Sequence, residues 1–562
     1  MVRQFIRNST QVLFRRQTTI VSAAVIMMFL VLASIVLGLI RNRFLAHYFP
    51  IDQIGAYKAS FVVPDLLSSI LITGMLSVAF IPVFTTYLNN KQEKEAWNIA
   101  DSVVNISLLF YLSLAIGIFI FIRPITETFV VPGFSPEKVA LTTNLARVIL
   151  IAQIFLIIGS FFTSVLQSFH RFIIPAIAPV LYNVGIIIGI LWLRPFFGFI
   201  GVAWGVLIGA FFFMLIQFLL VKKFGFKYKF ELRLRDKGVI DIIKLSLPRA
   251  IGVGLARVEW WVSIFLSSLL VAGSANTGIF GFAADIQNFP ISLFGVTFAT
   301  AALPMLSAEW ATNKLEHFKA TFLTTLHQVI YLTVPLSILL MTLRIPIVRI
   351  IYGSGFFDWD ATVATAVTTS YFAIGIFAQS GVLLLIRTFY ALHDAATPLK
   401  VAVGSLIFHV TISSFLVFFV APKVLIPVAL LGLSASFTGI FSFFILLYLL
   451  HRKVGGFDKH KLFVPAGKIF FSAAAMGLLL YIPLHVKIGG TYVIDYIIDT
   501  TRVFNLLILT AAALILGLAI YVALTWWLKS EELKNFLKLL PDIRRLQKFL
   551  IIQEKFDASN PK

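Results

Sequence analysis

The amino-acid sequence predicts an all-α integral membrane protein of about 14 transmembrane helices, built as two parallel six-helix repeats plus two C-terminal helices. Of its 562 residues, 59% are hydrophobic and only 13% are charged, and the mean hydropathy is +0.96. A soluble chain carries roughly a quarter charged residues. The apolar residues also form long blocks, such as 21–40, 149–166 and 506–527. Each block has about 20 residues, the length that crosses ~30 Å of hydrocarbon.

The spans can be placed in order from the apolar blocks and the polar turns between them. A basic lead, 1–19, precedes the first span. Near Pro195 and Pro422, prolines mark very short turns between neighbouring spans. The predicted spans are 20–46, 56–86, 99–122, 139–168, 173–194, 199–221, 239–271, 277–307, 319–343, 361–391, 398–420, 425–450, 466–486 and 503–528.

The charge of the connections predicts the orientation in the membrane. Lys and Arg gather in connections after even-numbered spans, above all 223–238 and 452–461, whereas 272–277 has none. Cytoplasmic loops carry such an excess, so both termini are predicted to be cytoplasmic. This bias explains the net charge of +21 without nucleic acid as a partner. The basic and leucine-rich tail, 529–562, is predicted to be an amphipathic helix on anionic membrane lipid, or else a solvated tail.

An internal repeat sets the predicted architecture. Pro64 in the second span matches Pro290 in the eighth, 226 residues later, and two further pairs of segments match at offsets of 222 and 223. Because each repeat has six crossings, its two copies should lie parallel in the membrane, as in carriers that work by alternating access. The predicted parts are the lead 1–19, a first repeat 20–222, a basic loop 223–238, a second repeat 239–451, two additional helices within 452–528 and the tail 529–562.

Several polar residues lie inside predicted spans, where a charge costs at least ~2.5 kcal/mol unless it has a partner or a wet cavity. Clustered cations would suit a phosphate or pyrophosphate headgroup. Arg41, Lys58 and Arg257 are the main cavity candidates, each weighed against a structural role. Arg257 could instead pair with Glu259, although residues two apart do not face each other on a helix. The full set of candidates for substrate binding is Arg41, Asn42, Lys58, Asp65, Arg257, Glu259 and Asp285.

Prolines and glycines interrupt the second and eighth spans. Pro64, Gly74, Pro290 and Gly295 are candidate hinges. Such residues allow a membrane helix to bend, but they also allow close helix packing. The sequence leaves both readings open.

Missing motifs argue against enzyme chemistry. The chain has no cysteine, so a disulfide, a thiolate nucleophile or a Cys metal site is impossible. It contains neither a GxxxxGK[ST] phosphate loop nor an HExxH motif. We therefore predict a protein with no catalytic residues, metal or cofactor.

Seven short segments together resemble one family of transporters. They are 34–41, 59–67, 74–82, 132–134, 171–179, 294–304 and 389–398. In this order they resemble the MurJ (MviN) family of lipid II flippases, within the multidrug/oligosaccharidyl-lipid/polysaccharide exporter superfamily. The resemblance implies movement of undecaprenyl-pyrophosphate-linked peptidoglycan precursor between the leaflets of the bacterial cytoplasmic membrane.

The family's cationic set is only partly present. Arg41 matches a family arginine, and Asp285 is kept. Three other family arginines are replaced by Ile35, Ser68 and Ile286. The family's sodium coupling maps weakly to Asp394, for which a helix-capping role is the better interpretation.

Three functions therefore stay open. The first is flipping of lipid II, a lipid-linked anionic substrate. The second is export of another polyprenyl-linked saccharide, because the headgroup arginines are depleted. The third is a scaffold without transport, with cell-wall synthases as its partners.

Overall fold

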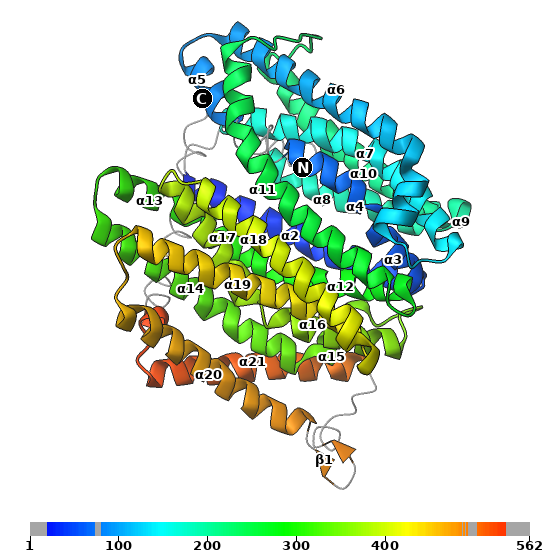
Figure 1. Cartoon of the computed structure of the whole chain (residues 1–562), viewed down its shortest axis with the longest axis vertical. Coiled ribbons are helices and arrows are strands. Elements are labelled where there is room, and N and C mark those ends of the chain that lie inside the picture. Colours follow the sequence, from blue (N-terminus) through cyan, green and yellow to red (C-terminus); the bar gives the residue numbers. More distant parts are fainter. Residues whose placement is uncertain (1–19, 73–79, 486, 489–490, 493–502, 535–562) are drawn as a thin grey trace, which may run out of the picture. The chain divides into compact units, whose positions relative to one another are not determined.

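The computed structural model describes residues 20–72, 80–485, 487–488, 491–492 and 503–534. The basic lead 1–19, the hinge candidate Gly74 and most of the predicted amphipathic tail lie outside the described residues. Figure 1 shows the elements in chain order. The α-helices are α2 Ile20–Tyr48, α3 Ile51–Ser60, α4 Val62–Ser69, α5 Phe80–Asn89, α6 Glu93–Ile125, α7 Pro136–Ser168, α8 Ile173–Ile188, α9 Arg194–Phe197, α10 Ile200–Val221, α11 Lys237–Ser268, α12 Gly273–Pro290, α13 Thr297–Ala311, α14 Leu315–Thr342, α15 Arg344–Tyr352, α16 Trp359–Ala373, α17 Ile376–Ala391, α18 Ala396–Phe415, α19 Ala429–Lys453, α20 Lys459–His485 and α21 Val503–Trp527.

Short π- and 3-10-helical segments extend or join several of these helices. The π-helical segments are η2 Thr126–Val130, η3 Gly189–Leu193, η5 Ile291–Val296 and η6 Leu416–Val420, and the 3-10 segments are η4 Lys222–Phe224 and η7 Ala421–Lys423. Two strands, β1 Lys487–Ile488 and β2 Thr491–Tyr492, pair antiparallel in the connection between α20 and α21. The elements predicted from the sequence include no strand there.

The number of spans agrees with the sequence. Within the described residues, 13 helices are long and apolar enough to cross a membrane, and a fourteenth span results if α16 and α17 count as one. These two helices meet at an angle of 46°. The predicted span 361–391 is therefore bent, with the break near Gly375. The all-α membrane fold of about 14 helices is confirmed.

The chain forms two compact units. The first comprises 1–282, 351–364 and 402–431, and the second comprises 283–350, 365–401 and 432–562. The boundary falls inside α12, whereas the predicted sequence repeats meet in the loop 223–238. The repeat boundaries stay a prediction, because compactness does not measure sequence repetition.

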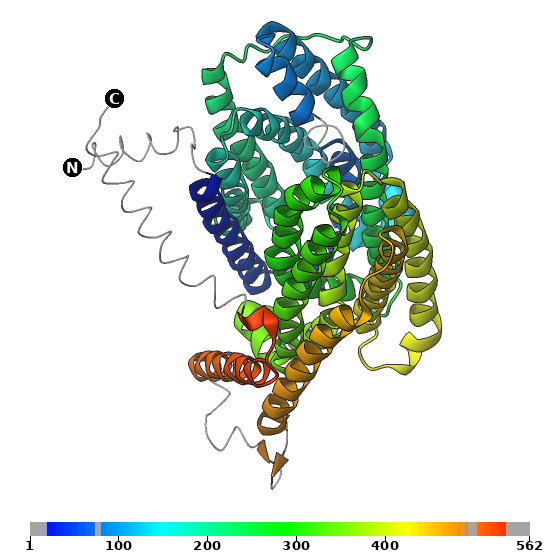
Figure 2. The same ribbon diagram turned by 90° about the vertical axis from the view of Figure 1, so that its left-hand side faces the viewer.

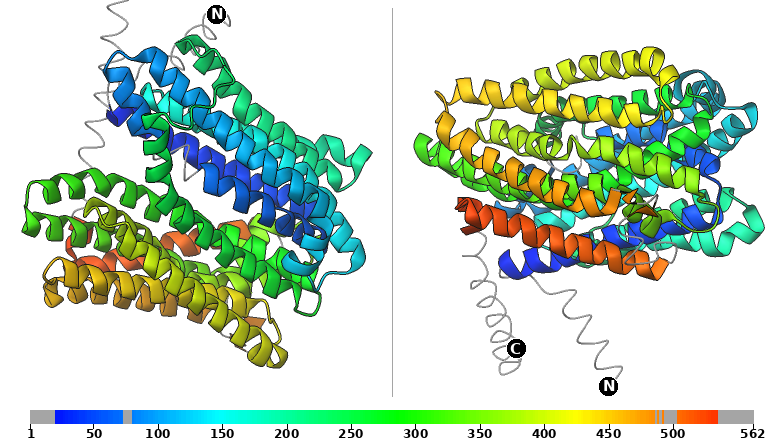
Figure 3. Two further views of the ribbon diagram at one scale, coloured as in Figure 1. Left: turned by 45° about the horizontal axis from the view of Figure 1, so that its top comes forward. Right: turned by 90° about the horizontal axis from the view of Figure 1, so that it is seen from below.

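In the first unit, glycines let two helices approach to backbone contact. α8 and α10 lie side by side (Figures 1 and 3). A Cβ added to Gly209 would lie 2.4 Å from the carbonyl oxygen of Tyr182, and one added to Gly185 would lie 2.2 Å from the Cα of Gly209. Membrane helices use such small residues because packing, rather than the hydrophobic effect, holds them together.

In the second unit, α14 packs against α17 and α20, and α20 packs against α21 (Figures 2 and 3). Buried aromatic residues such as Phe318 and Phe322 contribute to its apolar core. The Tyr521 hydroxyl on α21 donates to the carbonyl oxygen of Tyr331 on α14, at 2.9 Å. The two C-terminal helices are thus part of the second unit's core and not a loose addition.

Candidate substrate-binding site

Arg41 lies on α2 and is held by two neutral side chains. Its Nε and Nη2 donate to Oδ1 of Asn42 at 3.1 and 2.9 Å, and its Nη1 donates to Oδ1 of Asn183 on α8 at 3.0 Å. Asn183 is fixed in turn, because its amide donates to the carbonyl oxygens of Ser34 and Pro179, both at 3.2 Å. No carboxylate pairs with Arg41 among the described residues. The guanidinium is therefore oriented while its positive charge stays uncompensated.

A second polar group joins three helices of the first unit. Asp65 on α4 accepts a hydrogen bond from Nε2 of Gln153 on α7 at 2.8 Å, and its other oxygen lies 3.8 Å from Nη1 of Arg257 on α11. Gln153 is only 2% exposed, whereas the Arg257 side chain is 44% exposed. The Arg257 charge is partly compensated by Asp65, and the loose contact leaves guanidinium donors available to a ligand.

The Arg257 contact answers the question that the sequence left open. Arg257 pairs with Asp65 and not with Glu259. This agrees with helical geometry, because residues two apart on a helix do not face each other. The Glu259 carboxylate forms no ion pair within the part of the chain that the structure describes. Its backbone oxygen accepts from the Ser263 hydroxyl at 3.2 Å, and that hydroxyl also contacts Nε2 of His409 at 3.0 Å.

Lys58 lies on α3 where α3 meets the first turns of α12. A Cβ on Gly281 would lie 2.7 Å from Cγ of Lys58, and Nζ lies 5.7 Å from the ring centroid of Phe282. The lysine stem thus packs on α12 with its ammonium group over an aromatic face, a favourable arrangement for a cation. Asp285 follows on the same helix, half-buried and in the second unit.

Two positions that lack the family arginines are buried in this chain. Ser68 is 3% exposed and Ile286 is 4% exposed, whereas Ile35 is half-buried. An arginine at Ser68 or Ile286 would need a partner, because a buried unpaired charge is strongly unfavourable.

The hinge candidates differ in their surroundings. Pro64 is buried in α4, just after the break between α3 and α4 at Phe61. Pro290 ends α12, and the π-helical segment η5 follows directly. π-Helical turns recur at functional sites. Gly295 lies inside η5, where an added Cβ would be 2.9 Å from Cα of Ser380 on α17. This contact favours close packing at Gly295 over bending.

Asp394 lies between α17 and α18 in the second unit. Oδ1 accepts from the backbone N–H of Thr397 in the first turn of α18 at 3.0 Å, and Oδ2 accepts from the Thr397 hydroxyl at 2.6 Å. The Lys453 ammonium group lies 2.5 Å from Oδ2. Burial alone would raise the pKa of Asp394, but hydrogen bonds from Lys453 and Thr397 outweigh it and lower the pKa to about 2. These contacts favour capping over ion coupling.

Replacement of Asp394 by Ala should destabilise the purified protein by about 1 kcal/mol at neutral pH, the usual value of a capping side chain. A carboxyl with a lowered folded-state pKa stabilises the fold above its unfolded-state value, and this contribution is lost as the pH falls from 3.8 to about 2. Thermal unfolding at several pH values measures the effect. Asp394→Asn retains a good cap and should keep transport. Loss of transport with unchanged stability would instead support an ion site.

The structure brings together residues that the sequence did not single out as site residues. Gln153 and Asn183 hold Asp65 and Arg41, respectively. The sequence does indicate that Gln153 and Asn183 have partners, because both are amide side chains inside apolar spans, where a polar group needs one. Their partners could not be predicted, since these depend on which helices are neighbours.

Solved structures share this fold. A lipid II flippase MurJ in an inward closed conformation has a TM-score of 0.72 at 23% identity, covering 89% of this chain and 98% of that one. An inward-facing MATE-family transporter of the MOP superfamily has a TM-score of 0.63 at 14% identity, covering 77% of this chain and 98% of that one. The fold therefore defines the class of multi-pass, all-α membrane proteins.

Sequence comparisons narrow this class to one family. The model of the family described as "Lipid II flippase MurJ" matches residues 45–502. A probable lipid II flippase MurJ of Buchnera aphidicola is 28% identical over 467 residues, 81% of this chain and 88% of that protein. One of Rickettsia prowazekii is 25% identical over 528 residues, 92% of this chain and all of that protein. The chain belongs to the MurJ family, and the predicted resemblance is confirmed.

Proposed function

We propose that this protein moves lipid II, the undecaprenyl-pyrophosphate-linked peptidoglycan precursor, from the inner to the outer leaflet of the bacterial cytoplasmic membrane. Membership of the MurJ family supports the substrate class. The observation that carries the proposal is the geometry of Arg41, whose charge is oriented by Asn42 and Asn183 and meets no carboxylate in the part of the chain that the structure describes. A fixed guanidinium can bind pyrophosphate oxygens through two parallel hydrogen bonds.

We infer that transport proceeds by alternating access, without enzyme chemistry and with both termini in the cytoplasm. The fold supports this mechanism, since MATE-family transporters with it have been solved in inward-facing and outward-facing conformations. The basic connections 223–238 and 452–461 support the orientation. Lys58, Asp65, Arg257 and Asp285 are the further residues proposed to act on the cargo headgroup.

A different polyprenyl-linked cargo is the second candidate. Ile35, Ser68 and Ile286 stand where the family has arginines, and the burial of Ser68 and Ile286 favours a smaller cationic site. A headgroup with fewer negative charges would require fewer arginines.

Two experiments test the proposal with the full chain. The gene should restore growth to a bacterium depleted of its own lipid II flippase. Native mass spectrometry of the purified protein should show tighter binding of lipid II than of an undecaprenyl-pyrophosphate-linked saccharide without the peptide. Failure to rescue, together with preference for the other lipid, would replace the first candidate by the second. Absence of binding to either lipid would contradict both.

A further inference from the structure

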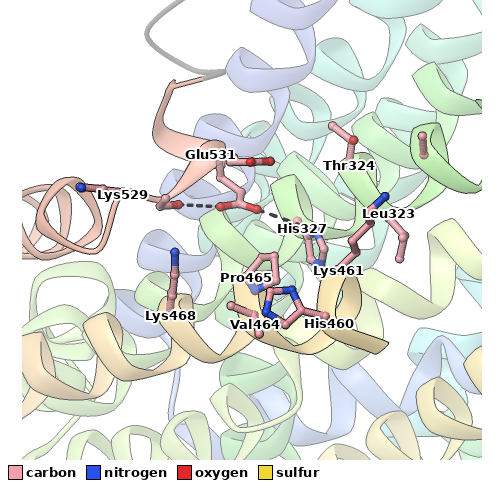
Figure 4. A pocket seen from close by; sticks show the side chains of 13 residues that line it. Leu323, Thr324, His327, His460, Lys461, Val464, Pro465, Lys468, Lys529 and Glu531 are labelled. Atoms are coloured by element: carbon pink, nitrogen blue, oxygen red, sulfur yellow. Dashed lines mark hydrogen bonds and ion pairs between the residues drawn. The ribbon is translucent and has the colours of Figure 1, made fainter. Parts of the chain in front are cut away.

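A cavity outside the proposed cargo site opens in the second unit. Its volume is about 320 Å³. It is bounded by α14, by the first half of α20 and by the segment 529–532 that follows α21 (Figure 4). None of the candidate cargo residues lines it.

Buried contacts fix the wall that segment 529–532 forms. Glu532 is 5% exposed, and its Oε2 accepts from the Ser530 hydroxyl at 2.6 Å. Its Oε1 lies 3.8 Å from Nδ1 of His327 on α14. Nε2 of His327 is 3.1 Å from the carbonyl oxygen of Leu462, so this nitrogen carries the proton. The Ser530 hydroxyl thus holds one oxygen of the Glu532 carboxylate within the wall.

The lysines that line the cavity have no such partners. Lys461 and Lys468 come from α20 and Lys529 from the segment after α21. None of the three forms an ion pair with any residue that the structure describes. The exposed Glu531 is the other acidic residue of the lining. Three lysines face two carboxylates, so the lining has an excess of one positive charge.

Lys468 is the lysine of the lining that lies within a predicted span. It is nine residues past the start of α20, about 13.5 Å along the helix axis at 1.5 Å per residue. It thus belongs to the candidate span Lys459–Pro483. Its side chain points towards the segment 529–532 (Figure 4). In the predicted span 466–486 it lies two residues from the cytoplasmic end, where a lysine side chain meets water or the anionic headgroups of lipids.

The surroundings favour a lipid over a free anion. Val464 and Pro465 give the cavity an apolar side beside its lysines. One turn beyond Lys468, Phe471 is 59% exposed, and Leu478, two turns farther, is 65% exposed. Residues spaced by three, four or seven lie on one helix face. This face of α20 therefore presents cations at one end and an apolar surface towards the membrane interior, which matches a phosphate group followed by acyl chains.

We propose that this cavity binds the phosphate of an anionic phospholipid that is not the transported cargo. The ammonium groups of Lys461, Lys468 and Lys529 meet the phosphate oxygens, and the acyl chains follow the exposed apolar face of α20. Basic pockets between membrane helices at the cytoplasmic side bind lipid headgroups in this way. With the proposed orientation, the lipid comes from the inner leaflet.

The test uses native mass spectrometry to measure the binding of phosphatidylglycerol to the delipidated full-length protein. Lys468→Gln should weaken binding roughly tenfold, equivalent to about 1.4 kcal/mol. Lys459→Gln is the matched control, because Lys459 lies in the first turn of the same helix and does not line the cavity. It should bind as the wild type does. Lys529→Gln, outside the helix, should repeat the Lys468→Gln effect if the latter variant folds poorly.

Two further ligands identify the source of the phosphate. Phosphatidylcholine, which has no net charge, should bind at least about tenfold more weakly than phosphatidylglycerol, because the lysines of the lining outnumber its carboxylates. Inorganic phosphate should not displace phosphatidylglycerol, because it lacks the apolar contacts. Equal binding of both lipids, unchanged binding by both lysine variants, or full displacement by inorganic phosphate would each overturn the proposal. Rescue of growth reports on the cargo site separately.

Discussion

Asn183→Asp should abolish rescue of a flippase-depleted bacterium as completely as Arg41→Ala. The Asn183 oxygen lies 3.0 Å from Nη1 of Arg41. A carboxylate at this position keeps the side-chain volume but adds a negative charge beside the guanidinium. At an effective dielectric constant of about 20, two opposite charges 4 Å apart attract by about 4 kcal/mol. The cargo pyrophosphate would have to compete with this ion pair.

Three controls distinguish an effect on the Arg41 charge from a loss of folded protein. Arg43→Ala removes another arginine from the same helix, whose Nη1 is 3.5 Å from the Ile351 carbonyl oxygen, and it should retain rescue. Arg41→Lys should rescue only in part, because lysine is a single point charge without the planar fork of arginine. Membrane abundance of each variant must match the wild type. Full rescue by Asn183→Asp would show that the cargo does not need the Arg41 charge.

Gly209→Leu should strongly destabilise the first unit. The Cβ alone would lie 2.4 Å from the Tyr182 carbonyl oxygen, and this atom belongs to the backbone of α8 and cannot move aside as a side chain can. Overpacking of a core usually costs about 1–3 kcal/mol, and separation of two helix backbones should exceed that range. The expected results are a large loss of membrane-inserted protein and a lower unfolding temperature in detergent.

Gly117→Leu is the matched control for this substitution. Gly117 lies in α6, where an added Cβ would meet nothing within 4 Å. Leucine favours a helix over glycine by up to about 1 kcal/mol, so this variant should be as stable as the wild type or slightly more stable. Similar losses in both variants would mean that the α8–α10 contact is not what makes Gly209 necessary.

The sequence was informative about spans and capping, which depend on neighbouring residues. Apolar length alone predicted the membrane helices. Asp394 was best interpreted as a helix cap, and the Thr397 contact agrees with that interpretation. The strands β1 and β2 were missed, although a Gly489–Gly490 pair between short β-branched runs is typical of a hairpin.

The contacts between helices were harder to predict. Asp65, Gln153 and Arg257 come from helices far apart in the chain, so their meeting depends on how the bundle packs. The spacing of four between Gly185 and Gly189, and between Gly201, Gly205 and Gly209, is typical of close membrane-helix contacts. This spacing does not reveal which helix is the partner. Polar side chains in spans thus indicate that a partner exists, and only the fold identifies it.

The α8–α10 contact also limits how the first unit can change shape. Two backbones that touch at Gly185 and Gly209 cannot slide past each other without a collision, so both helices must be displaced as one rigid body. Internal deformation during a transport cycle is then easiest where the helical hydrogen-bond ladder is already interrupted. In the first unit, the break between α3 and α4 at Phe61, three residues before Pro64, is such a place. The first unit thus combines a rigid α8–α10 pair with a helix break that can bend, next to Lys58 and Asp65.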